Sequence, residues 1–171
     1  NREYSLSKDI VNNNLTTDCI KVKDENISLD CKGYFISSDD GVSGVYSDQD
    51  NTTIKNCNIS MGTGTGGIGI EFILASNSKA YSNTLNNQFY GLYGSSDYLI
   101  VENNTALSKE VGLYLDGANY NNASRKIVNS NQLGMVLYGG SYNNLTNNTA
   151  SSNVLTGINL TISRNNTLSN N

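Results

Sequence analysis

Three stretches repeat a single pattern: GLYGSSDYLIVENNTAL from Gly91, GLYLDGANYNNASRKIVNSN from Gly112 and GMVLYGGSYNNLTNNTASSN from Gly134. Each begins with glycine, alternates apolar with other residues, and passes through Asn and Ser into a second short strand-like run. A period in the low twenties, built from short alternating runs and polar corners, is typical of coils stacked into a solenoid. The same opening glycine recurs at Gly44, Gly69 and Gly157, so that successive steps are 25, 22, 21, 22 and 23 residues.

Two positions, one and three places after each opening glycine, are mostly apolar. Because side chains alternate across a strand, these positions share a face, and coils stacked about 4.8 Å apart place them in interior columns. The first column contains Val45, Ile70, Leu92, Leu113, Met135 and Ile158, and the second contains Ser47, Phe72, Gly94, Leu115, Leu137 and Leu160.

The pattern predicts an all-β fold in one domain over residues 1–171: a single-stranded parallel β-helix of about seven coils, each of 21–25 residues. The chain begins without Met and ends within a repeat, so we expect it to be a fragment of a longer chain. Asparagine pairs such as Asn103-Asn104, Asn147-Asn148 and Asn165-Asn166 follow the second strand of their coils. Corner asparagines tolerate left-handed backbone geometry and can bond their amides to neighbouring coils, so we expect ladders there.

Composition excludes several classes of function. The net charge is −4 with eleven dispersed Lys and Arg, whereas nucleic-acid binding needs a basic patch. The longest nearly apolar run, residues 68–75, is far shorter than the roughly 20 residues of a spanning helix, so membrane insertion is not expected. The chain has no His, and no cluster of carboxylates with a basic residue is evident, so we predict no catalytic residues and no cofactor.

The N-terminal third resembles a known family. YSLSKDI at residues 4–10, DCIKVKDENISLDCKGYFI at 18–36 and NTTIKNCNI at 51–59 are similar to right-handed parallel β-helix proteins of the NosD-like, carbohydrate-binding and sugar-hydrolase repeat group. The resemblance extends over essentially the whole chain and implies a right-handed β-helix of an archaeal or bacterial surface protein. The group mixes enzymes, adhesins and structural stalks, so the function it implies is broad.

The three cysteines are Cys19, Cys31 and Cys57. Cys31 and Cys57 end the similar phrases ISLDC and TIKNC in consecutive coils, and an odd count permits at most one intramolecular disulfide. Two interpretations stay open, buried thiols or one bridge near the N-terminal end. A metal site is not expected without His or a CxxC motif.

Carboxylates and glycines supply two weaker signals. Asp39, Asp40, Asp48 and Asp50 are candidate calcium ligands because they crowd one loop and the strand that follows it. GTGTGG at residues 62–67 formally matches the dinucleotide motif, but no helix follows it, so we interpret it as a loop.

Several tyrosines and asparagines are candidate functional residues on the surface. Tyr46, Tyr93 and Tyr114 stand two places after opening glycines, on the outward face, where they are candidates to contact a sugar or a second protomer. The alternative is simple strand propensity. Ten N-x-S/T sequons are candidate glycosylation sites: Asn14, Asn26, Asn51, Asn58, Asn103, Asn122, Asn144, Asn147, Asn159 and Asn165.

Together these features predict an extracellular, cell-surface, non-enzymatic structural module, such as a stalk, a filament subunit or an adhesin. Unpaired coil edges invite strand addition, so the expected partners are copies of itself or neighbouring domains of the same protein. The alternative is a polysaccharide-binding or polysaccharide-cleaving module, which would present a groove of carboxylates or a tyrosine platform.

Overall fold

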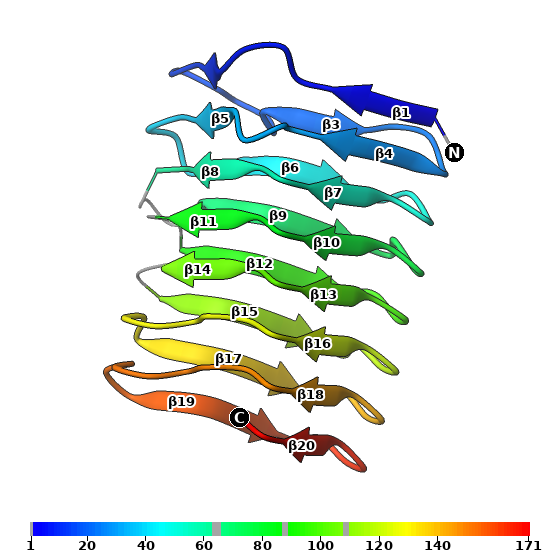
Figure 1. Cartoon of the computed structure of the whole chain (residues 1–171), viewed down its shortest axis with the longest axis vertical. Helices are drawn as coiled ribbons and strands as arrows, with labels where there is room; N and C mark the ends of the chain where they lie inside the picture. Colours follow the sequence, from blue (N-terminus) through cyan, green and yellow to red (C-terminus); the bar gives the residue numbers. More distant parts are fainter. Residues whose placement is uncertain (1, 63–65, 87–88, 108–109) are drawn as a thin grey trace.

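The computed structural model describes residues 2–62, 66–86, 89–107 and 110–171, and the regular structure in these residues consists of short β-strands. The strands wind in coils that stack along one axis (Figure 1). Each coil runs through sheet A, then past sheet B, then through sheet C, and every strand pairing is parallel. No described segment forms a helix that is long and apolar enough to cross a membrane.

The strands of each sheet follow one another in coil order, and seven strands in sheet C confirm the prediction of about seven coils. Sheet A contains β1 (Arg2–Ser5), β4 (Ile27–Asp30), β7 (Thr53–Lys55), β10 (Lys79–Tyr81), β13 (Ile100–Glu102), β16 (Asn122–Ser124), β18 (Asn144–Thr146) and β20 (Thr167–Ser169). Sheet B contains β2 (Ile10–Val11), β5 (Phe35–Ser37), β8 (Asn58–Ser60), β11 (Thr84–Asn86) and β14 (Thr105–Leu107). Sheet C contains β3 (Ile20–Val22), β6 (Ser43–Ser47), β9 (Ile68–Ile73), β12 (Tyr90–Ser95), β15 (Val111–Asp116), β17 (Leu133–Tyr138) and β19 (Thr156–Thr161).

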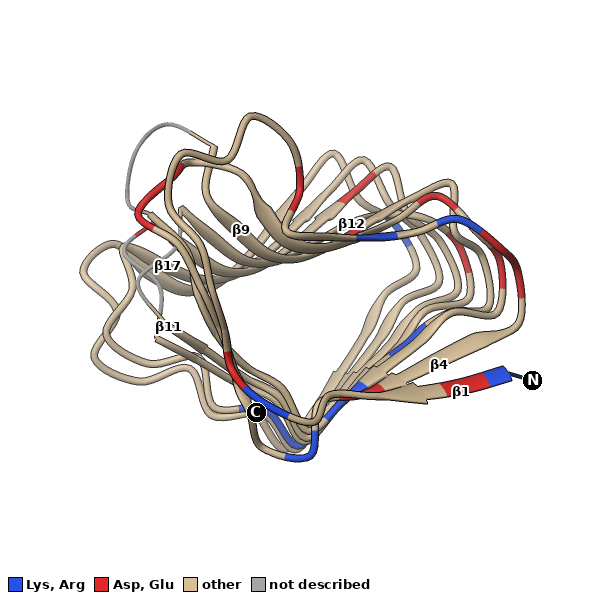
Figure 2. Ribbon diagram, turned by 90° about the horizontal axis from the view of Figure 1, so that it is seen from above, with Lys and Arg blue, Asp and Glu red and all other residues tan. Residues whose placement is uncertain are grey.

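Both predicted interior columns are confirmed by the register of sheet C. Ile70 pairs with Leu92 and Leu92 with Leu113, while Phe72 pairs with Gly94 two positions further along. The columns are buried from the second coil to the sixth. Seen along the axis, the three sheets enclose this core, and charged residues are scattered around the outline (Figure 2).

The opening glycines recur because a side chain has no room there. A Cβ added at Gly44 would lie 2.5 Å from Cγ2 of Ile59, and one at Gly134 would lie 2.4 Å from the carbonyl oxygen of Gly157. Both distances are too short for a real contact, so this position accepts only glycine without a shift of the neighbouring coil. Of the predicted GTGTGG loop, residues 63–65 lie outside the described residues.

Where an asparagine pair forms a sharp corner of a coil, its two members have different roles. At the corner between sheets A and B (the A/B corner), Asn103 and Asn147 have φ of 53° and 55° and make the left-handed turn. The next residue points inward: Asn148 accepts a hydrogen bond from the Lys126 backbone N–H (3.1 Å) and donates one to the Ala123 carbonyl oxygen (3.0 Å). The expected ladder therefore exists, with the first residue turning the chain and the second linking the coils.

Candidate functional site

The outer face of sheet C carries a cluster of aromatic side chains. Tyr93 and Tyr114 pair in register on neighbouring coils, and their rings stack at 5.7 Å with an angle of 11°. Tyr90 lies 5.4 Å from Tyr114, and Phe89 meets Tyr90 edge-on at 4.8 Å. We call Phe89, Tyr90, Tyr93 and Tyr114 the aromatic cluster. Such a surface offers flat apolar faces beside polar hydroxyls, as a sugar ring requires.

A carboxylate holds this cluster in place. The Tyr93 hydroxyl donates a hydrogen bond to Asp116 Oδ2 (3.0 Å). Burial, the hydrogen bond to Asp116 and the negative charge of Asp116 all raise the pKa of Tyr93 above its ordinary value, in that order of size. Burial is also the main cause that raises the pKa of Tyr90 and of Tyr114. The phenols therefore stay protonated and can donate hydrogen bonds at any physiological pH.

A second carboxyl group lies in the same sheet. Glu71 accepts a hydrogen bond from the Ser43 hydroxyl. Burial raises the pKa of Glu71, the hydrogen bond from Ser43 opposes this shift, and the nearby charge of Asp18 adds to it. Glu71 occupies the coil between Tyr46 and Tyr93, because Tyr46 pairs with Glu71 and Glu71 pairs with Tyr93.

The structure therefore brings together two of the three predicted outward tyrosines and separates the third. Tyr46 lies one coil beyond Glu71, where the Lys21 ammonium group sits 4.6 Å from its ring centroid. The same lysine forms an ion pair with Asp48 (3.3 Å). Sequence reasoning missed Phe89 and Tyr90, since they precede the opening glycine and only the fold turns them toward Tyr93 and Tyr114.

The four candidate calcium ligands have separate partners. The Asp40 carboxylate accepts hydrogen bonds from the Leu15 backbone N–H (2.6 Å) and the Ser38 hydroxyl (2.9 Å), which lower its pKa. Asp39 binds the Asn13 side chain, Asp48 binds Lys21 and Gln49, and Asp50 accepts from the Ser76 backbone N–H. Within the described residues, no three His, Cys, Asp or Glu side chains are grouped so that they could hold a metal ion.

The cysteines differ in state. Cys31 and Cys57 form a disulfide that bridges consecutive coils across a sequence separation of 26 residues. Cys19 is a half-buried free thiol, and burial raises its pKa. The disulfide lies in the same corner column as the ladder asparagines, because the Cys57 backbone N–H donates to Asn83 Oδ1 (3.0 Å).

None of the ten sequon asparagines is buried, because the ladder uses other asparagines. The exposed ones are Asn14, Asn26, Asn51, Asn103, Asn122, Asn147 and Asn165, and the half-buried ones are Asn58, Asn144 and Asn159.

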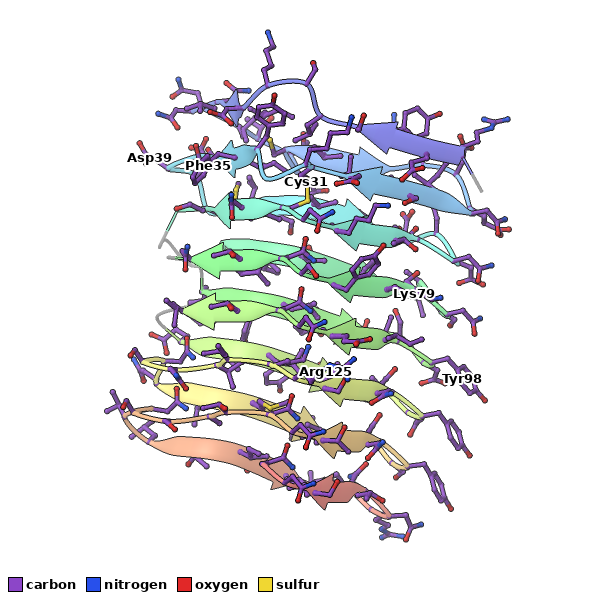
Figure 3. The ribbon with its side chains drawn as sticks, in the orientation of Figure 1. Cys31, Phe35, Asp39, Lys79, Tyr98 and Arg125 are labelled. Atoms are coloured by element: carbon purple, nitrogen blue, oxygen red, sulfur yellow. A yellow bond between two sulfur atoms is a disulfide. The ribbon has the colours of Figure 1, made fainter. Side chains whose placement is uncertain are left out.

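A second tyrosine array follows the sharp corner between sheets C and A (the C/A corner). Tyr98, Tyr120 and Tyr142 stack at 5.3 and 5.1 Å with angles of 8° and 5°, and we call them the tyrosine ridge. Figure 3 shows Tyr98 pointing away from the coils at this edge. About half of each side chain is exposed. The ridge could have been recognised from the sequence, because its members are spaced by 22 residues, one coil.

Comparison with known families agrees with this architecture. A family model described as a right-handed beta helix region matches residues 38–171, most of the chain, and the chain belongs to that family. Neither the curated proteins nor the solved structures that were compared contain a match to the chain.

Proposed function

We propose that this chain is a non-enzymatic structural module of a surface protein, in which the end coils bind further β-helical coils. The module supplies length and a polar, glycosylatable outer face, and its partners are copies of itself or neighbouring domains of the same protein. Within the β-helix family, we propose that the chain is related to the NosD-like group, on the basis of the N-terminal phrases quoted above.

The observation that carries this proposal is the uncovered interior of the last coil. Leu168 pairs with Leu145 and Leu160 pairs with Leu137, so both leucines continue buried columns. Their side chains are 43% and 40% exposed, whereas Leu145 and Leu137 are fully buried. A further coil would remove this apolar area from water and pair the free edges of β19 and β20.

The first coil also leaves part of its interior uncovered. Tyr4 of β1 pairs with Leu29 and is half exposed, although Leu29 is buried. An apolar hollow of about 390 Å³ opens between β1, β3 and β4, and Leu6, Ile20, Val22 and Ile27 line it. Coil-on-coil stacking would fill this hollow and satisfy the outer edge of β1.

An extracellular location is supported by the disulfide and the surface chemistry. Disulfides persist in oxidising compartments and are rare in the cytosol. The outward corners carry asparagine rather than a basic patch, which suits a hydrated outer surface.

Association of the purified chain tests the proposal. We expect wild-type chain to form concentration-dependent end-to-end species by light scattering and small-angle X-ray scattering, and Leu168→Asp to reduce them at least tenfold, since a charge would be buried in the contact. Leu74→Asp is the matched control, because Leu74 is 76% exposed and lies on the third coil, away from both ends. A wild-type chain that stays monomeric at high concentration would count against the proposal. An equal loss of end-to-end species in Leu168→Asp and Leu74→Asp would also count against it.

A second candidate function is polysaccharide binding at the aromatic cluster, favoured by the stacked Tyr93 and Tyr114 beside Asp116. We expect Tyr93→Ala to abolish binding in a glycan array or in affinity electrophoresis with acidic and neutral polysaccharides, while Tyr46→Ala leaves it unchanged. Absence of binding and of reducing-end release by the wild-type chain would eliminate this candidate.

A further inference from the structure

We infer that the tyrosine ridge is a platform for N-linked glycans carried by Asn122 and Asn144. The inference rests on the proposed surface role, because only a chain that meets a glycosylation machinery would carry them. It selects two of the ten sequons and gives the ridge a ligand, a sugar attached to the same chain.

The first argument is the spacing between ring and amide. Tyr120 precedes Asn122 by two residues, and Tyr142 precedes Asn144 by two. In both cases the residue between them is buried: Asn121 Oδ1 accepts from the Leu99 backbone N–H (2.6 Å), and Asn143 Oδ1 accepts from the Asn121 backbone N–H (2.8 Å). Tyr120 and Asn122 are exposed and the residue between them is buried, so ring and sequon amide share the outer surface.

The second argument is that the two pairs lie one above the other. Asn122 pairs with Asn144 in sheet A, and the Tyr120 and Tyr142 rings stack at 5.1 Å. Tyr98 extends the ridge by one coil, and its own partner at the sequon position is Ile100, which pairs with Asn122. A sugar on Asn122 would thus meet the Tyr98 and Tyr120 rings and the exposed Ile100 side chain.

The third argument is that tyrosine is energetically unfavourable in the backbone conformation of this corner. The three tyrosines have φ of 57° to 59°, a left-handed conformation that asparagine adopts more readily. Asparagine does occupy the same corner in other coils, at Asn51, Asn77 and Asn165. Tyr120 has a stacked ring on each side, and about half of each tyrosine stays exposed, so the ridge presents ring edges and hydroxyl groups for a further contact. A pyranose offers both C–H groups and hydroxyls to such a surface.

The modification itself is an ordinary group transfer. The Nδ2 atom of Asn122 forms a bond to C1 of a sugar activated as a lipid-linked phosphate ester. The bond between C1 and the phosphate oxygen breaks, the lipid phosphate leaves with the electron pair, and the amide loses one proton to a base of the transferase. No oxidant or reductant takes part.

Two other sequons serve as matched controls. Asn103 and Asn147 are exposed at the A/B corner, but the residues two places before them, Val101 and Leu145, are buried in the core. A glycan at either site has no ring beside it from its own strand.

The test compares two sites and two backgrounds. The chain is secreted from a eukaryotic host that glycosylates N-x-S/T, and also made in a bacterial host without this modification as the unglycosylated reference. Asn122→Gln and Asn147→Gln are each made with Tyr120 and with Tyr120→Asn, a variant that suits the left-handed corner and creates no new sequon. Peptide mass spectrometry gives occupancy, and thermal unfolding gives the Tm of each sample.

When Tyr120 is present, we expect Asn122→Gln to lower the Tm of the glycosylated chain by about 2–4 °C more than it lowers the Tm of the bacterial reference, the shift expected from one aromatic contact in a chain of this size. This difference should vanish with Tyr120→Asn, whereas the effect of the Asn147 glycan should be the same in both backgrounds. An empty Asn122 beside an occupied Asn147, or an equal difference without Tyr120, would overturn the inference. End-to-end association of the bacterial sample is measured in a separate experiment. A failure of the proposed structural function is therefore distinguished from a failure of the glycan inference.

Discussion

At the residue scale, Lys126 occupies a position of the A/B ladder that asparagine fills in other coils. Asn83, Asn104, Asn148 and Asn171 occupy this column in other coils, and each bonds to the coil before it. The Lys126 side chain is buried, and its Nζ atom has no hydrogen-bond partner among the described residues. The Lys126 side chain makes neither of the two ladder hydrogen bonds, so it interrupts the ladder and leaves a buried amine unsatisfied.

Replacing this residue should stabilise the chain. In Lys126→Asn, the new Oδ1 could accept from the Asn104 backbone N–H and the new amide could donate one coil back, as Asn148 does to Ala123. We expect the free energy of unfolding to rise by about 1–3 kcal/mol, measured by urea denaturation. Lys126→Met is the control, since it removes the amine without restoring the ladder and should give a smaller gain. A loss of stability in both variants would show that the amine has a partner.

The same residue predicts a pH dependence. Burial lowers the pKa of Lys126 well below its ordinary value of 10.5, so the unfolded chain binds more protons between the lowered pKa and 10.5. The free energy of unfolding should therefore increase as the pH rises through that window. Urea denaturation from pH 7 to 10 measures the slope, and Lys126→Met should flatten it. An unchanged slope in the variant would assign the dependence to other groups.

The two members of an asparagine pair should respond differently to truncation. Asn104 accepts hydrogen bonds from the Asn83 backbone N–H (3.0 Å) and side chain (2.9 Å) and donates to the Ala80 carbonyl oxygen (2.8 Å). Asn104→Ala should cost about 2–3 kcal/mol in unfolding free energy because buried partners lose their bonds. Asn103→Ala changes an exposed left-handed residue, removes one exposed hydrogen bond from Arg125 Nε (3.2 Å) and should cost about 1 kcal/mol. Equal losses would mean that the ladder adds nothing beyond the turn.

At the scale of the element, the disulfide places one covalent link between two positions of the A/B column that asparagine fills in other coils. Cys31 and Cys57 join the second coil to the third, and both are buried. Closing a loop of this length lowers the entropy of the unfolded chain. The double variant Cys31→Ser with Cys57→Ser should therefore lose about 3 kcal/mol in unfolding free energy under oxidising conditions. Wild-type chain treated with reductant should approach the double variant, whereas Cys19→Ser should match wild type.

At the scale of the whole molecule, stability should fall toward both ends, because each coil packs only on its neighbours. Central strands such as β12 and β15 have a coil on each side, whereas β1 and β20 have one. Hydrogen exchange followed by mass spectrometry should show amides of β12 and β15 protected at least tenfold more than those of β1 and β20. If association covers the ends, protection there should rise with protein concentration. Uniform exchange over all coils would indicate one cooperative unit.

The sequence alone determined the coil. Its period, the inward columns and the asparagine corners depend on strand alternation and on a fixed spacing between coils, and both are local rules that read directly from residue order. The column from Val45 to Met135 could therefore be assigned in advance, with its partners in register.

Only the tertiary structure decided which outward side chains meet. The bond from Tyr93 to Asp116, the approach of Phe89 and Tyr90 to the stacked tyrosines and the choice between thiols and a bridge at Cys31 depend on side-chain directions and on distances between coils. A repeat pattern gives the register of the coils but does not give the rotamers of their side chains. Lys126 lies 22 residues from both Asn104 and Asn148, so the spacing places it in the asparagine column, but only the structure shows that its side chain is buried with an Nζ atom that has no partner in the described part of the chain.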